Sequence, residues 1–366
     1  MSALPGMAAA VRASRTSSDS RPPPKSFSWP RTMLEYWQTI GIVAMEGRGF
    51  EYPTDTVVAR NGRLYVPNRS RDFGERGVRV TIFDLDSEYY GTFGHLGEDD
   101  GQLISPTCAA ESSQGQIYVA DDYMHRITAF DYDGGFITNW GTHGPAEGEL
   151  NGPSGVAFDS DDNIYVADTH NSRIQKFTSS GTFLNAFGSQ GSFEGQFRLP
   201  WGLTVAPNGD LYVTDWGNDR IQRFSPEGDF VAAYGASGRG DGELRRPSGV
   251  AVDESGRMYV SDWGNERVQV LDPDGAPIQV LRGEATLSKW AAGFMETNRE
   301  EADARATADL SPDLPEVYGD DPHTQSAHVE SLFWAPVSIK LDAAGRVYVT
   351  EANRHRIQIY RRKSSS

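Results

Sequence analysis

Cysteine is nearly absent from this sequence, which contains only Cys108 among 366 residues. A single thiol forms no intramolecular disulfide, so a small disulfide-stapled secreted scaffold is excluded. Long apolar runs are also missing, since no stretch approaches the ~18 residues that a membrane-spanning helix requires. The first residues, MSALPGMAAAV, have an apolar stretch but no preceding basic residue, so we expect no signal peptide. These features favour a cytoplasmic location, with export by an unrecognised signal as the alternative.

Basic residues are in the minority. Lys and Arg number 34 against 51 Asp and Glu, which gives a formal net charge of −17. Such a surface repels nucleic acid and anionic membranes, so we expect neither as a partner. We expect an acidic, soluble monomer. The 39 glycines and 20 prolines favour many turns and short strands over long helices.

One sequence unit recurs along the chain. Its entry prolines Pro106, Pro153, Pro200 and Pro247 follow one another at intervals of 47 residues. A second marker is a tyrosine within an aliphatic-Tyr-Val segment, found at Tyr65, Tyr118, Tyr165, Tyr212, Tyr259 and Tyr348. A constant period across several units is a much stronger signal than any single motif.

Each unit divides into four short strands. The apolar residues after the proline form an inner strand, and a tight turn leads to the Tyr-Val strand. A polar loop then leads to an Arg-Ile-Gln strand, and a second turn leads to an outer strand. Four antiparallel strands per period are the signature of a propeller blade. Six copies therefore predict an all-β, six-bladed β-propeller.

These motifs resemble the NHL repeat family. The resemblance lies in Gly-(apolar)-Ala-(apolar)-Asp, then Tyr-Val-x-Asp, then Asn-x-Arg-Ile-Gln, and it extends over about residues 36–360. It implies a six-bladed propeller that acts as a docking platform, and it implies no single activity.

Counting strands indicates how the ring closes. The sixth unit stops at Tyr360 after its third strand, while a spare outer strand, residues 36–41, precedes the first unit. We expect this N-terminal strand to complete the last blade and to cover an exposed edge. Residues 1–35 are rich in Ser, Pro and Arg and are expected to form a disordered tail. The predicted organisation is this tail followed by a single propeller, residues 36–366.

Two columns of charged residues recur in register. An arginine opens the third strand of every unit, and an acidic residue ends the second strand of units two to six: Asp121, Asp168, Asp215, Asp262 and Glu351. Six arginines resemble an anion-binding ring. Because buried charges must be paired, we interpret the two columns as ion pairs within each blade.

Two insertions interrupt the period. The loop between the second and third strands of the first unit is longer than in the other units and contains Phe73. The connection between the fifth and sixth units holds a larger insertion, residues 284–333. Because strands alternate in direction, both insertions emerge on the face that carries the loops between second and third strands and the connections between blades. We call it the loop face and expect it to carry function.

The large insertion is partly helical by its pattern. Its apolar residues follow the spacing i, i+3, i+4 and i+7 within residues 285–295: Leu287, Trp290, Ala291 and Phe294. Residues 299–310 suit a second helix. The apolar stripe is expected to pack on the propeller, with a lid over the central channel or a partner-docking helix as alternatives.

The resemblance also raises one catalytic activity. NHL-like propellers include a zinc lyase that cleaves peptidyl-hydroxyglycine, and its metal histidines directly follow the entry proline. The corresponding residues here are Thr54, Thr107, Ser154, Trp201, Ser248 and Val337. None is a metal ligand of that kind, so this activity is disfavoured and no metal or other cofactor is expected.

Three histidines lie in loops of the loop face. His125 and His355 share a column directly before the arginine, and His170 precedes that column by two positions. A composite metal or acid–base site across blades is an open alternative, as in a streptogramin-type lyase. No pair has metal-ligand spacing. Cys108 stands where other units have Gly and is interpreted as core packing.

Aromatic residues break the repeat at several positions. Trp201 replaces the small residue after the entry proline, and Trp216 and Trp263 occupy the same loop position in adjacent units. With Tyr123 they form a candidate aromatic platform, since Trp and Tyr are enriched at binding hot spots. Covering a neighbouring blade is the alternative role.

The preferred function is a non-catalytic binding or scaffold propeller that recognises a protein or peptide on the loop face. The alternative is a lyase or hydrolase with a composite metal and histidine site. The candidate residues are Phe73, Tyr123, His125, His170, Trp201, Trp216, Trp263 and His355.

Overall fold

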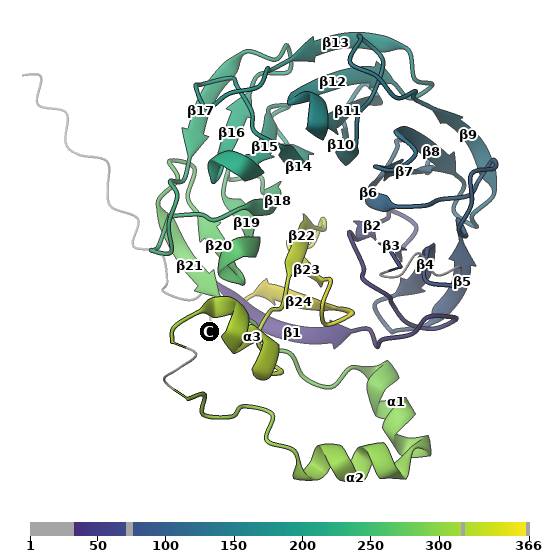
Figure 1. Ribbon diagram of the computed structural model, residues 1–366, viewed down its shortest axis with the longest axis vertical. Helices are drawn as coiled ribbons and strands as arrows, with labels where there is room; N and C mark the ends of the chain where they lie inside the picture. Colours follow the sequence, from purple (N-terminus) through teal and green to yellow (C-terminus); the bar gives the residue numbers. More distant parts are fainter. Residues whose placement is uncertain (1–32, 71–75, 316–318, 364–366) are drawn as a thin grey trace, which may run out of the picture. The chain divides into compact units, whose positions relative to one another are not determined.

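Six four-stranded antiparallel sheets form a propeller ring (Figure 1). The computed structural model describes residues 33–70, 76–315 and 319–363. The sheets β2–β5, β6–β9, β10–β13, β14–β17 and β18–β21 are blades 1 to 5, and the sixth has the order β1-β24-β23-β22. The predicted all-β, six-bladed architecture is confirmed.

The strands follow the predicted order from the centre outward. The inner strands are β2 (Val57–Val58), β6 (Pro106–Glu111), β10 (Pro153–Phe158), β14 (Pro200–Val205), β18 (Pro247–Val252) and β22 (Pro336–Leu341). The second strands are β3 (Arg63–Asn68), β7 (Ile117–Asp121), β11 (Asn163–Asp168), β15 (Leu211–Asp215), β19 (Met258–Asp262) and β23 (Val347–Glu351). The third strands are β4 (Arg79–Asp84), β8 (Arg126–Phe130), β12 (Arg173–Thr178), β16 (Arg220–Phe224), β20 (Arg267–Leu271) and β24 (Arg356–Arg362). The outer strands are β5 (Tyr89–Phe93), β9 (Phe136–Trp140), β13 (Phe183–Phe187), β17 (Phe230–Tyr234), β21 (Pro277–Leu281) and β1 (Leu34–Ile40).

The repeated residues mark the same place in every blade. An entry proline is the first residue of five inner strands, where its missing N–H breaks no ladder bond. All six column tyrosines are buried, and the hydrophobic clusters join side chains of neighbouring blades. The core therefore lies between the blades, as the stacking of amphipathic repeats requires.

Blade 6 contains strands from both ends of the described chain. β1 pairs antiparallel with β24, from Leu34 opposite Arg362 to Ile40 opposite Ile357. The strand begins at Leu34 rather than at residue 36, so the expected tail boundary at residue 35 is corrected. Leu34 is buried in the core, and its N–H donates to Gln279 Oε1 at 2.9 Å. Residues 1–32 of the expected tail lie outside the described residues.

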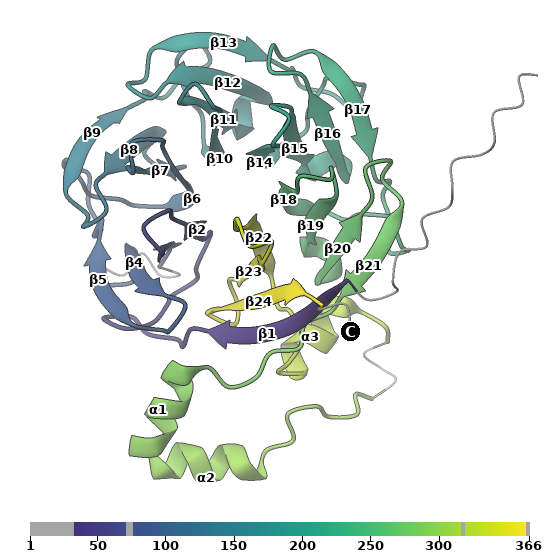
Figure 2. The same ribbon diagram turned by 180° about the vertical axis from the view of Figure 1, so that it is seen from behind.

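The insertion contains three short helices, α1 (Lys289–Thr297), α2 (Arg299–Thr307) and α3 (Pro322–His328). The sequence predicted helices in this insertion, but it did not predict α3. In both face-on views α1 and α2 lie beyond the outer strand β1 and away from the centre of the ring (Figures 1 and 2). This position does not fit a lid over the central channel.

A single side chain anchors the first helix. Trp290 is 1% exposed, packs on Phe50 and Phe83, and donates from Nε1 to the Ser87 carbonyl at 2.6 Å. The expected apolar stripe is otherwise wrong, because Leu287 is 40% and Phe294 is 41% exposed. The helix starts after residue 288 because the Ser288 hydroxyl caps it, accepting the N–H of the residue three positions on.

None of the helices in the described part of the chain combines the length and apolar character that a membrane span requires.

Candidate functional site

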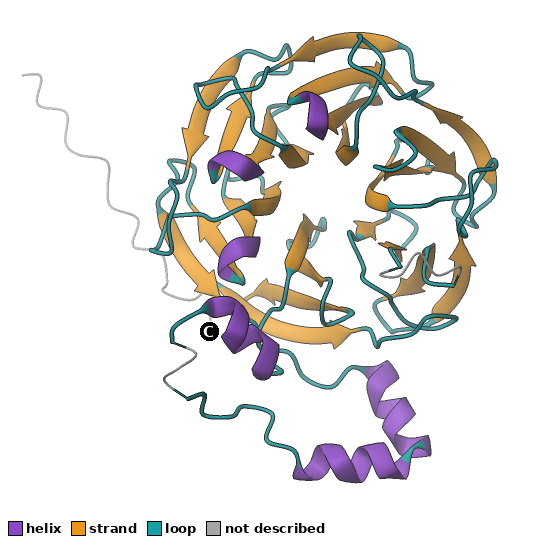
Figure 3. Ribbon diagram, viewed as in Figure 1, coloured by secondary structure: helices purple, strands orange, loops and turns teal. Residues whose placement is uncertain are grey.

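The loop face is built by the same backbone contact in all six blades. In each blade, an N–H from the loop after the second strand donates to the carbonyl two residues before the entry proline, or to the one directly before it. In blades 4 and 5 these bonds run from Gly217 to Arg198 at 2.7 Å and from Gly264 to Arg245 at 2.8 Å. In blades 3 to 5 the loop forms a single 3₁₀ turn, η1 (Thr169–Asn171), η2 (Trp216–Asn218) or η3 (Trp263–Asn265) (Figure 3).

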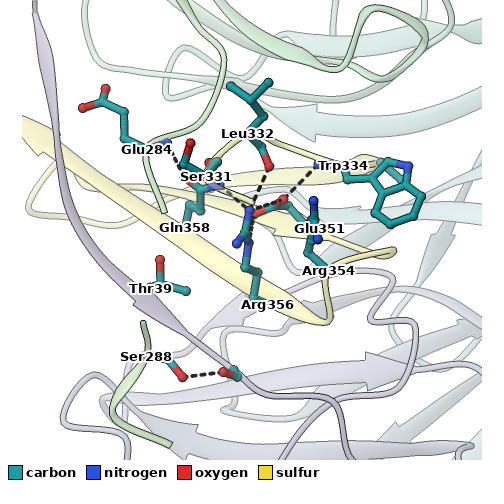
Figure 4. A network of polar contacts seen from close by, with 12 residues as sticks. Thr39, Glu284, Ser288, Ser331, Leu332, Trp334, Glu351, Arg354, Arg356 and Gln358 are labelled. Carbon is teal, nitrogen blue, oxygen red and sulfur yellow. Dashed lines mark hydrogen bonds and ion pairs between the residues drawn. The ribbon is translucent and has the colours of Figure 1, made fainter. Parts of the chain in front are cut away.

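The charged columns form ion pairs in four blades. The arginine Nε lies 2.7 to 2.8 Å from the carboxylate in Asp168–Arg173, Asp215–Arg220, Asp262–Arg267 and Glu351–Arg356. A glutamine two residues after each arginine donates to the same carboxylate, as Gln358 does to Glu351 in blade 6 (Figure 4). Burial raises the pKa of Asp262, and the hydrogen bonds it accepts oppose that rise. The columns are framework in these blades, as predicted.

Blades 1 and 2 depart from this pattern. Arg126 donates to the carbonyls of Glu98, Asp99 and Gln102, while Asp121 accepts only backbone N–H groups among the described contacts. The predicted Asp121–Arg126 ion pair is therefore wrong. Blade 2 has Met and Thr where blades 3 to 5 have the Asn and Gln that hold the carboxylate. In blade 1 the acidic position is Asn68.

In blades 2, 4, 5 and 6 the side chain of the residue before the column arginine bonds to the next blade. His125 Nδ1 accepts the Gly152 N–H at 3.0 Å, and His355 Nδ1 accepts the Tyr52 N–H at 3.0 Å. Blades 4 and 5 use a carboxylate for the same contact, from Asp219 to the Arg246 N–H and from Glu266 to the Ala335 N–H. His125 and His355 thus act as hydrogen-bond acceptors between blades.

The structure brings two of the three candidate histidines into one neighbourhood. The rings of His125 and His143 stack with centroids 4.2 Å apart, and burial, followed by the charge of His143, lowers the pKa of His125. His170 also lowers that pKa. His355 instead packs edge-on against Tyr52, and burial lowers its pKa to about 4. Within the described ranges, no three His, Cys, Asp or Glu side chains group as metal ligands.

Two members of the aromatic platform are neighbours. The ring centroids of Trp216 and Trp263 are 6.3 Å apart, and both side chains are half-buried. Tyr123 is 59% exposed on blade 2 and makes no ring contact with them in the part of the chain that the structure describes. Phe73 lies outside the described residues.

Trp201 lies at the mouth of the central channel. It lines a pocket of about 300 Å³ with Tyr52, Pro53, Val337 and Arg69, among others. Arg69 is held by an ion pair to Asp122 with N and O 2.6 Å apart. The pocket has mainly apolar walls with one cation at its rim. Its lining includes the residues directly after four entry prolines, Thr54, Thr107, Trp201 and Val337, so it lies on the loop face.

A polar cluster fills the channel below this pocket. Asp55 accepts hydrogen bonds from Ser338 Oγ, from Cys108 Sγ at 3.0 Å and from the Ala109 N–H at 3.0 Å. The Lys340 ammonium lies 3.0 Å from the same carboxylate. Burial raises the pKa of Cys108 to about 12, so its thiol stays protonated.

Glycine residues line the rest of the channel wall, where neighbouring blades are in close contact. Blades 3 to 5 have Gly155, Gly202 and Gly249 where the other blades have Asp55, Cys108 and Ser338. A Cβ on Gly155 or Gly202 would lie 2.4 Å from a carbonyl oxygen of the next blade. The polar cluster therefore occupies one side of the channel, at blades 6, 1 and 2.

Sequence reasoning missed this cluster and placed Cys108 in the core without its partner. The overlooked signal was the second residue after each entry proline, where Asp, Cys and Ser replace Gly in three adjacent blades. The channel contains no free acid–base pair among the described residues, because these groups are engaged with one another.

Comparison with solved structures agrees with this fold. A catalytically inactive virginiamycin B lyase from Staphylococcus aureus with Quinupristin aligns with a TM-score of 0.53 and 12% identity, over 89% of this chain and 85% of that one. A protein of unknown function from Bacteroides thetaiotaomicron aligns with a TM-score of 0.58 and 18% identity, over 90% of this chain and 76% of that one. A candidate gluconolactonase aligns with a TM-score of 0.56 and 14% identity, over 90% of this chain and 94% of that one. At these identities the likeness concerns the fold alone. No curated protein matches the sequence.

Fold and neighbours define the class of this protein as a six-bladed β-propeller. The NHL repeat matches residues 150–177, 197–224, 244–271 and 333–360, which are the cores of blades 3 to 6. The chain therefore contains NHL repeats in four of the six blades of a β-propeller. The unmatched blades 1 and 2 are the two that lack the acid–arginine–glutamine network.

Proposed function

We propose that this chain is a binding propeller that recognises a segment of a protein or peptide on its loop face. The observation that carries the proposal is the pocket of about 300 Å³ at the channel mouth, where Trp201 replaces a small residue of the repeat. Binding sites for small groups are typically concave and apolar with a few polar anchors. One bulky side chain of a ligand fits such a volume.

The channel cluster supports a binding role over a catalytic one. Asp55 engages Cys108, Ser338 and Lys340 together, so its carboxylate is committed to holding three blades. The pKa of Lys340 is raised by Asp55 against the opposing effect of burial. A general base needs a pKa near the working pH, and a positively charged lysine does not provide one.

A peptide-display selection on the immobilised full chain tests the proposal. Selected peptides are synthesised, and their Kd is measured by fluorescence anisotropy for the wild type, Trp201→Ala and Leu184→Ala. Leu184 is an exposed apolar residue on the outer strand β13, so its variant is the control. We expect Trp201→Ala to weaken binding by at least about tenfold, as for a hot-spot residue, and Leu184→Ala by less than about twofold.

Two results would overturn the proposal. One is a selection that enriches no peptide above the background of an unrelated protein. The other is a set of peptides that bind Trp201→Ala as tightly as the wild type. Thermal unfolding of each variant shows that lost binding does not reflect lost folding.

A second candidate function, a lyase or hydrolase with a composite histidine site, is favoured by the stacked His125 and His143 near His170. Imidazoles are the commonest metal ligands and general acid–base groups. Calorimetric titration of wild type and His143→Ala with Zn²⁺ and Mg²⁺ tests it. Binding that is lost in the variant supports the site, and no binding to the wild type contradicts it.

A further inference from the structure

Blades 4 and 5 carry an arginine–tryptophan patch on the loop face, formed by Arg198, Trp216, Arg245, Arg246 and Trp263. The two indoles are 6.3 Å apart, and the Arg246 guanidinium lies 4.7 Å above the Trp216 ring. This distance is typical of a cation–π contact. The two tryptophans and the cation over Trp216 thus form one surface across the boundary between two blades.

The glycine after each tryptophan places an arginine beside it. A Cβ on Gly217 would lie 2.6 Å from Arg198 Cγ, and a Cβ on Gly264 would lie 2.8 Å from Arg245 Cγ. The stems of these arginines therefore pass over the Trp-Gly turns. Arginine two residues before the entry proline occurs in blades 4 and 5 alone, which are the blades with Trp-Gly. The pairing of a tryptophan with an arginine therefore occurs in both blade 4 and blade 5.

The three guanidinium groups have no anionic partner among the residues that the structure describes. Across the described residues, the side chains of Arg198, Arg245 and Arg246 form no hydrogen bond or ion pair, and all three are exposed. By contrast, Arg220 and Arg267 of the same blades are paired with carboxylates. Carboxylates are not scarce in this chain, which has 51 of them against 34 Lys and Arg.

The carboxylates next to the patch bond to groups other than its guanidiniums: Asp215 and Asp262 pair with the column arginines. Asp219 accepts the Arg246 backbone N–H and the Ser237 hydroxyl, and Glu266 accepts the Ala335 N–H and contacts His323. The patch is thus a small positive surface on a strongly acidic chain, with two apolar rings between its charges.

We propose that this patch binds an acidic segment of a partner peptide, with carboxylates on the arginines and an apolar or aromatic side chain against the indoles. The proposal rests on the binding function above and names its ligand chemistry. Arginine binds carboxylates through two parallel hydrogen bonds, and tryptophan and arginine dominate binding hot spots. In an extended peptide, side chains on one face repeat every ~6.7 Å, which matches the spacing of the two indoles.

The size of the patch favours an acidic peptide over nucleic acid. A polynucleotide carries charge along its whole length and extends beyond a patch of three arginines. The rest of this chain, with a net charge of −17, repels that extension, and repulsion acts over about 8 Å at physiological salt. A short acidic peptide with two or three carboxylates, by contrast, fits within the patch.

The test uses a fluorescein-labelled peptide, Gly-Asp-Glu-Phe-Asp-Glu-Gly, and a matched peptide with Asn and Gln in place of the acids. Anisotropy at about 50 mM salt gives Kd for the full chain, for Arg198→Ser/Arg246→Ser and for Arg48→Ser/Arg299→Ser. Arg48 and Arg299 are exposed outside the patch, so both double variants change the net charge equally. We expect a loss of at least about tenfold in the patch variant and less than about twofold in the control.

Three outcomes overturn the proposal: equal Kd values for the two double variants, equal binding of the uncharged peptide, or tighter binding of a ten-nucleotide oligo-dT than of the acidic peptide. The display-selected peptides separate this failure from that of the proposed function. If they still depend on Trp201 while the acidic peptide ignores the patch, the binding function stands and the acidic ligand is wrong. If neither ligand binds, both proposals fail.

Discussion

In blades 2 to 6 the residue before the column arginine has a left-handed backbone, and in blades 2, 4, 5 and 6 its side chain bonds to the next blade. His355 has φ +52° and accepts the Tyr52 N–H, which joins blade 6 to blade 1. Blade 4 achieves the same contact with Asp219, also at positive φ. A neutral imidazole is required for this role, because a protonated ring has no acceptor. The histidine therefore makes the seam between the first and last blades sensitive to pH.

His355→Asn is predicted to remove part of the acid sensitivity of folding. The folded pKa of His355 is about 4 and the unfolded value about 6.5, so the unfolded chain takes up the proton first. The free energy of unfolding therefore falls as the pH drops from about 6.5 to about 4, by roughly 1–2 kcal/mol for a partly exposed ring. An asparagine side chain keeps a hydrogen-bond acceptor for the Tyr52 N–H, and asparagine tolerates the positive φ of this position.

Urea unfolding at pH 7 and pH 5 measures this difference. We expect the wild type to lose more stability between the two pH values than His355→Asn. His95→Asn is the control, since His95 is exposed. An identical pH dependence in all three proteins would show that His355 is not the titrating group.

The ion pair in the channel is a second test at the scale of single residues. Asp55→Asn leaves the Lys340 ammonium without its counter-charge, so we expect a loss of about 2–3 kcal/mol in the free energy of unfolding. Asp55→Asn/Lys340→Met removes both charges and is expected to regain much of it. Asp133→Asn breaks the surface pair with Arg63 and is expected to cost less than about 0.5 kcal/mol. A double variant no more stable than Asp55→Asn would contradict the account.

At the scale of the element, most strands could be located from sequence because each has a fixed marker. The entry prolines open inner strands, and the column arginines open third strands. These positions are set by local backbone chemistry and by burial between blades. The channel cluster could not be found in this way, because Asp55 and Lys340 meet through ring closure and are far apart in the chain.

The insertion shows the same limit. Its helical spacing predicted a buried stripe, yet Trp290 is the one member of that stripe that is fully buried, while Leu287 and Phe294 stay exposed. Helix α3 was missed although Asp321 and Pro322 are a common helix start, with the Asp321 carboxylate accepting the Thr324 N–H. The periodicity of apolar residues alone does not show which face of a helix packs against the rest of the protein.

Trp290→Ala is predicted to destabilise the insertion and the sheet edge under it. Deleting a fully buried indole typically costs about 3–5 kcal/mol, and the bond to the Ser87 carbonyl is lost as well. Phe294→Ala on the same helix is the matched control, since Phe294 is 41% exposed and its variant should cost less than about 0.5 kcal/mol. Urea unfolding of both variants checks the contrast, and equal losses would show that Trp290 is no anchor.

At the scale of the whole ring, the special features gather where the two ends of the propeller meet. Blades 3 to 5 are held by glycine contacts at the channel and by a repeated acid–arginine–glutamine network. Blades 6, 1 and 2 share the Asp55 cluster at the channel in place of the glycine contacts, and blade 6, which keeps the network, also pairs β1 with β24. Because β1 and β24 come from opposite ends of the chain, the ring has one seam whose contacts are all long-range in sequence.

Removal of β1 tests whether this seam stabilises every blade or only the last one. A chain that starts at residue 42 lacks the strand, exposes the edge of β24 and loses the buried side chains of Leu34 and Ile40. We expect the melting temperature of the whole propeller to fall by about 10 °C or more, in one transition, because neighbouring blades share their cores. A chain that starts at residue 33 keeps β1 and is the control. If the shorter chain melts at the same temperature as the control, or if only a minor early transition separates from an unchanged main one, the strand does not close the ring.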